Sequence, residues 1–198
     1  MLSNRLFRLF MDTVTQEVGL DKLPAILSGN QLSPALLEPG SLVRLDAEQA
    51  CRANASIQQA LRLYYGRGAR GILLRIGQGM WNRMTSQANF LEKAELEIAR
   101  RLPVPARRRR ILEVLSARLR EAGGETSVHS VDLDLLLVDH CGLATLGQSS
   151  REPICFVTLG LIQGAFYWAT GRTVDVEEIA CLAAGAPACE FKIKLGVK

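Results

Sequence analysis

Three cysteines and one glutamate lie close together near the C-terminus of this 198-residue chain. They are Cys155, Glu178, Cys181 and Cys189, in a sequence with five cysteines altogether. Structural zinc takes four tetrahedral ligands, favours thiolate sulfur and accepts a carboxylate oxygen. The four residues are therefore a complete ligand set for a closed zinc site, in which the metal stabilises the fold and has no open position for catalysis.

The spacing of these residues leaves a second interpretation open. Glu-x2-Cys-x7-Cys is not one of the standard Cys/His zinc patterns. Cysteine is also among the most buried residue types and packs as a small hydrophobic side chain. On that interpretation the thiols are ordinary core residues and Glu178 is a solvated strand residue.

Two strands and a helix are expected to position the four side chains. Glu178 and Cys181 lie on a β-rich stretch, 173–182, and Cys189 opens the next one, 188–195. Gly185 and Pro187 between them indicate a hairpin turn. The hairpin folds Cys189 back towards Cys181, and Cys155 at the start of a helix over 153–170 completes the set.

The C-terminal motif resembles the 4-vinyl-reductase domain family. The resemblance lies in residues 155–164, in Gly171-Arg172 and in residues 178–191, with a weaker echo over residues 65–77. That family includes bacteriochlorophyll-synthesis proteins, archaeal hydrocarbon-binding proteins and the sensor domains of phenol- and xylene-responsive activators; vesicle-tethering subunits share its fold. The aromatic sensors hold zinc by three Cys and a Glu. The resemblance therefore implies a zinc cofactor held by Cys155, Glu178, Cys181 and Cys189.

Length and composition favour a single globular domain over residues 1–198. The chain is 48% hydrophobic and 22% charged, and its net charge of +4 is too small to indicate nucleic-acid binding. We find no secretory signal in the first 18 residues, and the cysteine number is odd. Both features favour the cytoplasm, where clustered cysteines more often bind metal than form disulfides.

Apolar periodicity predicts helices through the first two thirds of the chain. The expected helical segments are 4–18, a short helix within 21–39, 47–65, a helix from 69 through 80, 87–101 and one around 111–119. Residues 1–45 form an N-terminal helical extension whose apolar face packs on the domain or on a second subunit. In the helix 87–101, the face expected to be buried carries Phe90, Leu91, Ala94 and Ile98.

Glycine and arginine cluster between the second and third long helices. Gly66-x-Gly68-x-x-Gly71 follows a helix rather than a strand, which excludes a dinucleotide-binding interpretation. Close helix packing is the simpler role for these glycines. A second basic cluster, Arg107 to Arg110, could meet phosphates, acidic lipid or an acidic partner, but a solvated helical face is favoured.

Beyond residue 124 the apolar period changes to alternation, which is typical of strands. Strands are expected at 126–131, 133–139, 173–182 and 188–195. Residues 153–171 are uncharged and nearly long enough for a bilayer, but their Gly, Thr and Gln favour a buried helix over a transmembrane one. The predicted fold class is α+β: a helical N-terminal two thirds packed on a C-terminal four-stranded antiparallel sheet, with a long crossing helix.

His140 beside Cys141 suggests a metal or nucleophile site, but adjacent residues in a turn do not converge on one point, so a surface loop is favoured. The candidate ligand pocket lies on the helix 153–170. Its lining is predicted to include Phe156, Gly160, Gly164, Tyr167 and Trp168. The step from Gly160 to Gly164 permits close approach to a sheet or to a bound flat molecule.

The leading functional hypothesis, implied by the resemblance, is a sensor or carrier domain that binds a small hydrophobic or aromatic molecule and has a structural zinc site. The resemblance also implies a homodimer. Because we find no appended ATPase or DNA-binding domain in this sequence, we expect any signal to pass to a separate effector protein. Residues 132–138 contain no Trp, so phenol recognition by the aromatic sensors does not carry over.

Two alternatives are a vinyl reductase, or its accessory subunit, in chlorophyll synthesis and a scaffold subunit. The absence of nicotinamide, flavin or iron-sulfur motifs weighs against an enzyme.

Overall fold

The computed structural model of the chain describes residues 4–33, 45–121 and 123–196. Among these residues, six α-helices precede the sheet: α1 (Asn4–Val18), α2 (Leu23–Gly29), α4 (Ala47–Tyr65), α5 (Ala69–Ser86), α6 (Phe90–Arg101) and α7 (Val104–Glu121). They are followed by β1 (Thr126–Val131), β2 (Asp134–Asp139), α8 (Phe156–Thr170), β3 (Asp175–Ala180) and β4 (Cys189–Lys194), and two short 3-10 helices, Gly66–Gly68 and Leu182–Ala184, complete the described elements. The predicted α+β class is confirmed. Part of the loop expected within 21–39 lies outside the described residues.

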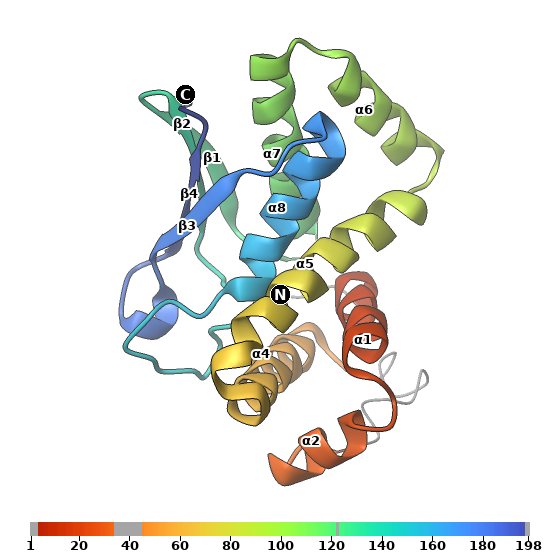
Figure 1. Cartoon of the computed structure of the whole chain (residues 1–198), viewed down its shortest axis with the longest axis vertical. Coiled ribbons are helices and arrows are strands. Elements are labelled where there is room, and N and C mark those ends of the chain that lie inside the picture. Colours follow the sequence, from red (N-terminus) through yellow and green to blue (C-terminus); the bar gives the residue numbers. More distant parts are fainter. Residues whose placement is uncertain (1–3, 34–44, 122, 197–198) are drawn as a thin grey trace.

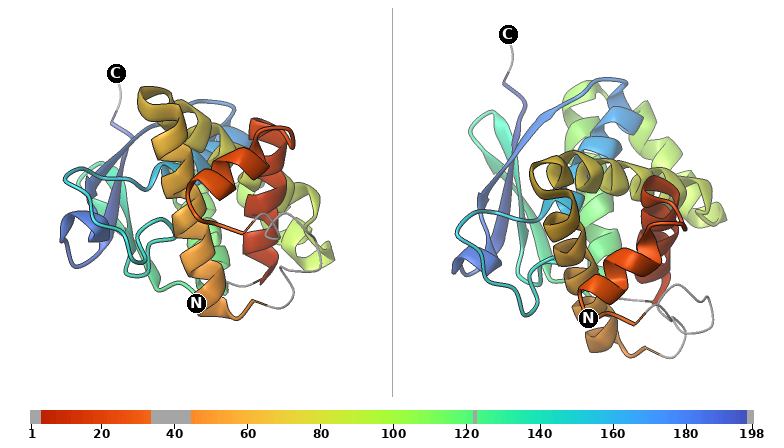
Figure 2. Two further views of the ribbon diagram at one scale, coloured as in Figure 1. Left: turned by 90° about the horizontal axis from the view of Figure 1, so that it is seen from below. Right: turned by 60° about the horizontal axis from the view of Figure 1, so that its bottom comes forward.

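The four strands form one antiparallel sheet in the order β1-β2-β4-β3. Helix α8 connects the β1–β2 hairpin to the β3–β4 hairpin, and the two hairpins meet where β2 pairs with β4. Helices α7 and α8 cover one face of the sheet, and the other helices lie beyond them (Figures 1 and 2). Leu137 and Phe191, paired across β2 and β4, are fully buried on that face.

Helices α5 and α8 cross at glycines, where their backbones touch. A Cβ on Gly77 would collide with the carbonyl oxygen of Val157, and one on Gly160 with the carbonyl oxygen of Leu74. Gly164 lies against Gln78 and Trp81 of α5. The close approach that the sequence indicates at Gly160 and Gly164 is therefore made to α5, and not to the sheet or to a flat ligand.

The glycines between α4 and α5 have a different role from the one expected. A Cβ on Gly66 or Gly68 would meet no atom within 4 Å, and one on Gly71 would meet only a side-chain nitrogen of Arg75 at 3.8 Å. Close packing is thus not their function. Gly66 ends α4 with a φ of 52°, a backbone conformation that favours glycine.

Helix α6 turns the face that was expected to be buried towards solvent. Phe90, Leu91 and Ile98 are 84%, 76% and 63% exposed, whereas Glu92 is buried. The prediction was wrong because hydrophobic periodicity carries no information about charged residues elsewhere in the chain that can pair with a buried glutamate. Glu92 faces inwards, where it pairs with arginines from α1 and α7.

Helix α1 uses its apolar face inside the domain. Its side chains at three- and four-residue steps are buried in the main core: Leu6, Phe7, Leu9, Phe10, Met11, Val14 and Val18. It packs against α5 and α4. Within the described residues, no helix combines the length and the hydropathy needed to cross a bilayer.

Candidate metal centre and ligand cavity

The fold brings Cys155, Glu178, Cys181 and Cys189 to one buried point. Cys155 is the residue before α8, Glu178 lies on β3, Cys181 follows that strand, and Cys189 begins β4. One ligand atom from each lies within 4.8 Å of all the others, and all four residues are buried. The predicted ligand set is therefore assembled by the tertiary structure.

The sulfur separations suit a tetrahedral metal. The Sγ of Cys155 lies 3.5 Å from that of Cys189 and 4.0 Å from that of Cys181. Zinc with Zn–S bonds of about 2.3 Å would place tetrahedral sulfurs about 3.8 Å apart. A disulfide would need about 2.05 Å, and none of these three cysteines forms one.

A β-bulge aims Glu178 and Cys181 at the same point. Residues three apart on a regular strand point to opposite faces. Here Glu178 pairs with Phe191 and Ala180 with Glu190, so Ile179 is an extra residue in the β3 ladder. The bulge changes the alternation, and both Glu178 and Cys181 are buried.

Hydrogen bonds hold the ligands and leave one oxygen open. The backbone N–H of Cys155 donates to Oε2 of Glu178 at 2.8 Å, and the N–H of Leu182 donates to the Sγ of Cys189 at 3.4 Å. Oε1 of Glu178 is buried and has no hydrogen-bond partner among the described residues. A buried carboxylate oxygen without a donor fits a site built for a cation.

The electrostatics of the cluster also favour a cation. Burial, with a further contribution from Cys181, raises the pKa of Glu178 to about 8, although hydrogen bonds from Cys155 oppose the rise. The pKa of Cys155 is raised because it hydrogen-bonds to the other two thiols and is buried. The pKa of Cys181 is lowered because the thiols of Cys155 and Cys189 stabilise its thiolate. Four acidic groups share a buried pocket, and a divalent cation would favour the charged form of each.

Arg62 on α4 lies near this cluster, which motif spacing did not reveal. It is half-buried, and its Nη2 donates to Oε1 of Gln148 at 3.3 Å. Burial lowers the pKa of Arg62, and the nearby charges of Cys155 and Cys181 counteract that effect. A cation on a distant helix is thus close enough to interact electrostatically with the cysteine cluster.

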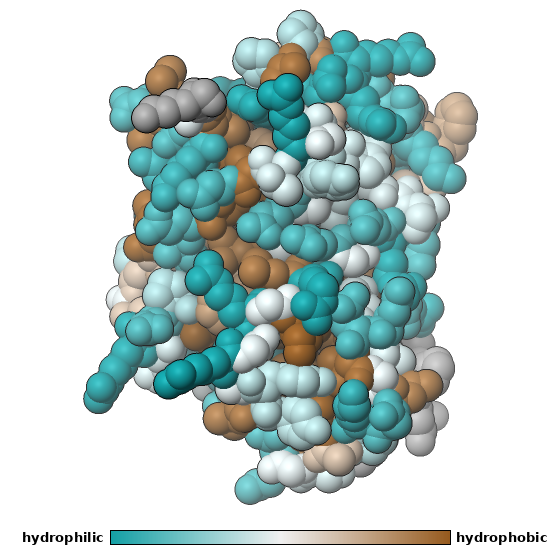
Figure 3. Space-filling view, in the orientation of Figure 1, coloured by the Kyte–Doolittle hydropathy of each residue, from teal (hydrophilic) through white to brown (hydrophobic). Residues whose placement is uncertain are grey.

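The five residues predicted to line a ligand pocket occupy different environments along α8. Gly160 and Gly164 contact α5, and Tyr167 is 60% exposed. Phe156 lies under the guanidinium of Arg70 at 5.8 Å, while Trp168 packs edge-on against Trp81. Apolar side chains gather in a band between the sheet and α8 (Figure 3). None of the five lines the cavity described next.

A cavity of about 290 Å³ lies among α1, α5, α6 and α7. Its apolar lining comes from Leu6, Leu9, Trp81, Met84, Leu96 and Val114. Arg5, Glu92, Arg118 and Glu121 also line it and are charged. Hydrophobic walls with a few polar groups are typical of small-molecule sites, and this volume is at the lower end of their range. Sequence reasoning missed the cavity, because its walls come from four separate helices.

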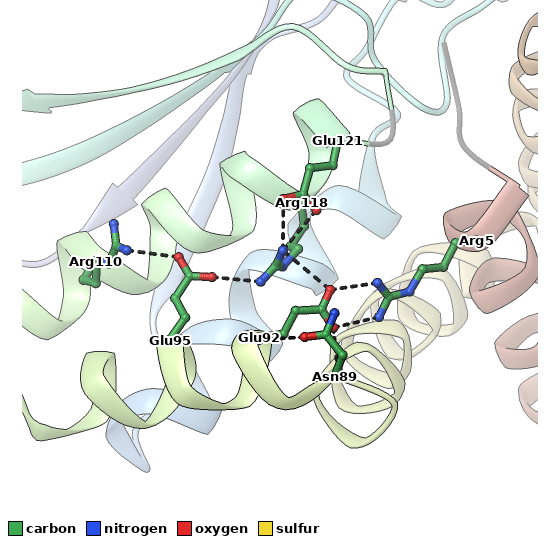
Figure 4. Close-up of polar contacts among 7 residues, drawn as sticks. All are labelled: Arg5, Asn89, Glu92, Glu95, Arg110, Arg118 and Glu121. Carbon is green, nitrogen blue, oxygen red and sulfur yellow. Dashed lines mark hydrogen bonds and ion pairs between the residues drawn. The ribbon is translucent and has the colours of Figure 1, made fainter.

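An ion-pair cluster joins three helices beside the cavity (Figure 4). Arg5 of α1 contacts both carboxylate oxygens of Glu92 of α6, at 2.7 and 3.1 Å. Arg118 of α7 contacts Glu95 at 2.8 Å, Glu121 at 3.0 Å and Glu92 at 3.6 Å. The hydrogen bonds from Arg5 lower the pKa of Glu92 to about 2.

The other two candidate regions do not form a site in this structure. His140 and Cys141 are exposed in the turn after β2. In the Arg107 to Arg110 cluster, Arg107 donates to the carbonyl oxygens of Leu102 and Ala169. Arg109 pairs with Glu113 and Arg110 with Glu95. These three arginines have partners within the chain.

Comparison with known proteins supports the motif and the fold. The family model of the 4-vinyl-reductase (V-4-R) domain matches residues 138–195. The uncharacterized protein MJ0745 of Methanocaldococcus jannaschii is 39% identical over 61 residues, which are 31% of this chain. The chain spans about a third of the length of that curated relative.

Solved structures share the fold at low sequence identity. An H-NOX protein from S. oneidensis, in its Fe(II)NO ligation state, superposes with a TM-score of 0.62 at 15% identity, covering 99% of this chain and 100% of that one. The phenol-responsive sensory domain of the transcription activator PoxR superposes with a TM-score of 0.52 at 16% identity, covering 75% and 74%. The resemblance to the 4-vinyl-reductase domain family is thus confirmed, and the sequence signature of that family occupies residues 138–195.

Proposed function

We propose that this protein binds a small hydrophobic molecule, as a sensor or carrier domain, in the cavity among α1, α5, α6 and α7. The observation that carries the proposal is the cavity itself, with its apolar lining inside an otherwise packed helical layer. Well-packed interiors rarely contain voids larger than a water molecule, and concave sites with mostly apolar walls and a few polar groups are typical of small-molecule binding. The 4-vinyl-reductase domain signature and the PoxR sensory domain support a ligand-binding role.

We further propose that Cys155, Glu178, Cys181 and Cys189 hold one structural zinc ion. Four protein ligands leave no open position, so the metal would supply cross-linking and charge neutralisation rather than water activation. Their positions mean that the ion would tie the start of α8 to the β3–β4 hairpin. The partnerless Oε1 of Glu178 and the sulfur separations support this assignment.

The cavity does not fit a haem, although the H-NOX proteins share the fold. Protein ligands to haem iron are His, Cys, Met or Tyr. The described residues that line the cavity include neither His, Cys nor Tyr, and Met84 is their one sulfur. Both histidines of the chain, His129 and His140, are exposed outside it. Homodimerisation and a separate effector protein stay predictions from the sequence.

The proposal is tested by native mass spectrometry and calorimetry on the full chain. We expect one zinc per chain and micromolar binding of at least one member of a panel of neutral one- and two-ring compounds. Leu96→Trp, which would fill the cavity, should abolish that binding. Leu63→Trp, at an exposed position on α4, is the matched control and should leave it intact. A zinc-loaded protein that binds no member of the panel, or binding that survives Leu96→Trp, would contradict the proposal.

A further inference from the structure

The outer side of α6 carries large apolar side chains that no other described residue covers. Phe90, Leu91 and Ile98 are mostly exposed. Leu91 and Ile98 are seven residues apart, about two helical turns, so they lie on one side of the helix, with the exposed Ala94 between them. Helix α6 lies at the periphery of the molecule (Figures 1 and 2). An exposed apolar surface of this kind usually marks a contact with another protein or with a membrane.

The corner between α6 and α7 is also apolar and exposed. Residues 102–106 read Leu-Pro-Val-Pro-Ala. Val104 is 46% exposed, and both prolines are exposed as well. The end of α6 therefore adds apolar surface to that of its outer side.

The charges of α6 are divided between its two sides. Glu92 and Glu95 point inwards, where arginines of α1 and α7 pair with them (Figure 4). Lys93 and Arg101 are exposed, and the side chain of neither forms a hydrogen bond or an ion pair with any described residue. Within α6, Glu97 is the remaining acid, 3.9 Å from an arginine one turn away. The outer side of the helix is therefore both apolar and positively charged.

Further cations gather where α6 ends. The guanidinium of Arg100 lies 4.9 Å from the ring centre of Trp168 on α8, and Arg107 of α7 donates to a carbonyl oxygen at the end of α8. The end of α6, the start of α7 and the end of α8 thus adjoin (Figure 1). Arg108 and Arg172 border one small hollow there, and among the described residues neither guanidinium has a hydrogen-bond or ion-pair partner.

An anionic membrane surface matches both properties of this region. A helix with Phe and Leu on one side and Lys and Arg beside them is typical of proteins that bind the interface of a bilayer. Each Lys or Arg close to an anionic leaflet strengthens binding by about fivefold. A second copy of the chain fits less well, because a two-fold interface pairs a surface with itself and would bring the same unpaired cations together.

We propose that the outer side of α6 docks this protein on anionic membrane surfaces. Phe90, Leu91 and Ile98 enter the apolar layer beneath the lipid headgroups, while Lys93 and Arg101 contact the lipid phosphates. The inner side of the same helix forms a wall of the cavity, so docking places that wall against the bilayer. The inference goes beyond the proposed function and does not require the cavity to hold a guest.

The test is co-sedimentation of the full chain with lipid vesicles of two compositions. One is phosphatidylcholine alone, and the other is equal parts of phosphatidylcholine and phosphatidylglycerol, which is anionic. We expect binding to the anionic vesicles to be at least about tenfold tighter, because several cations contribute to it. High salt should weaken that binding, since it screens exposed charges.

A double variant tests the cations. Lys93→Gln with Arg101→Gln should weaken binding to the anionic vesicles by about 25-fold, which is about fivefold for each cation removed. The matched control is Arg67→Gln with Arg151→Gln, which removes the same charge from exposed positions outside α6. That control should change the affinity by less than about twofold, because the attraction falls off within a Debye length of the membrane.

A second double variant tests the apolar side chains. Leu91→Ser with Ile98→Ser should weaken binding to the anionic vesicles by more than about tenfold, because both side chains lose their burial in the bilayer. Leu63→Ser with Leu133→Ser is the control, since both residues are exposed and lie outside α6. Both pairs are at the surface, and circular dichroism checks that each variant keeps its helices.

Three results would overturn the inference. They are failure of the wild type to bind anionic vesicles, equal binding to both kinds of vesicle, and equal losses in the α6 variants and their controls. Sedimentation velocity without lipid tests the other occupant: a dimer that Leu91→Ser with Ile98→Ser dissociates would show that a second copy covers this surface, which also overturns the proposal. None of these outcomes changes the calorimetric test of the cavity, so the two proposals can fail separately.

Discussion

Two clusters of ionisable side chains in this protein, each built around a buried glutamate, balance charge in opposite ways. In the cluster of Cys155, Glu178, Cys181 and Cys189, every member is an acid. In the cluster beside the cavity, Glu92, Glu95 and Glu121 alternate with Arg5, Arg110 and Arg118 (Figure 4). The pKa values of the two buried glutamates reflect these different charge environments. The pKa of Glu178 is raised to about 8 and that of Glu92 is lowered to about 2.

The comparison indicates which part of the fold would gain from a cation supplied from outside the chain. The arginines neutralise their glutamates, so the helical cluster is complete by itself. The cysteine cluster makes no salt bridge within the described residues. Arg62 lies near it, half-buried and bonded to Gln148, and the cluster needs a further positive charge before its acids can all ionise. Metal removal should therefore disturb the C-terminal part, whereas acid should disturb the helical part.

The largest effect is expected from loss of the metal. Chelation, Cys181→Ser or Cys189→Ser should remove zinc and lower the free energy of unfolding by at least about 4 kcal/mol, because a structural metal contributes directly to folding. Urea unfolding and zinc analysis measure this. Cys141→Ser, at an exposed thiol outside the cluster, is the control and should change neither. Unchanged stability in the cluster variants would show that the cysteines are ordinary core residues.

The next largest effect is expected at the close crossing of α5 and α8. Gly160→Ala should destabilise the protein by about 1 to 3 kcal/mol, because the new methyl group would collide with the Leu74 carbonyl oxygen and push α8 from α5. Gly71→Ala, on an open face of α5, should stabilise it by about 0.5 to 1 kcal/mol through helix propensity. Thermal unfolding compares them, and equal effects would mean that the crossing is not close-packed.

The stabilisation that the helical ion-pair cluster provides should depend on pH. Glu92→Gln should lower the free energy of unfolding by about 1 to 2 kcal/mol at pH 7. The full shift in the pKa of Glu92 corresponds to about 3 kcal/mol. We reduce that figure because the Arg5 side chain is half exposed, so solvent screens the pair. The folded pKa is depressed, so this contribution is present above the unfolded pKa of about 4.3 and is lost as pH falls through about 2.

Wild-type and variant stabilities should therefore converge towards pH 2 in urea titrations. Glu97→Gln removes an exposed pair with Arg100 at 3.9 Å and should have almost no effect at any pH. A difference between wild type and Glu92→Gln that stays constant from pH 7 to pH 2 would show that lost packing, not charge, causes it.

The smallest effect concerns Arg62. A zinc ion with three thiolates and one carboxylate has a net charge of −2, which a nearby guanidinium would stabilise. Arg62→Gln should weaken zinc binding by about tenfold, as other residues that support a metal site do. Competition with a chelator measures the affinity, and Arg62→Lys, which keeps the charge, should recover part of it. Equal affinities in all three proteins would remove Arg62 from the metal site.

Much of the local structure could be predicted because its causes lie within a few residues. Asp46 and Asn89 begin α4 and α6 with capping boxes, and Gly171 ends α8 in the left-handed conformation. Alternating apolar residues predicted the strands, and the hairpin that returns Cys189 to Cys181 followed from Gly185 and Pro187. These signals need no knowledge of distant partners.

The wrong prediction of the buried face of α6 shows what such local signals cannot determine. Periodicity assigned Phe90 and Leu91 to the core, yet Glu92 is buried because Arg5, 87 residues earlier, meets it. Arg62 and Trp81 were missed as site residues for the same reason. Each has its role only through elements distant in sequence.

By itself, the sequence determined the donor atoms of the proposed metal site, the number and type of most elements and the family signature. The tertiary structure alone decided which face of each helix is buried, how the bulge at Ile179 aims two ligands at one point, and where four helices leave a cavity. Caps, turns and periodicity act between neighbours along the chain. Burial and charge pairing depend on contacts between distant segments, which exist only once the chain has folded.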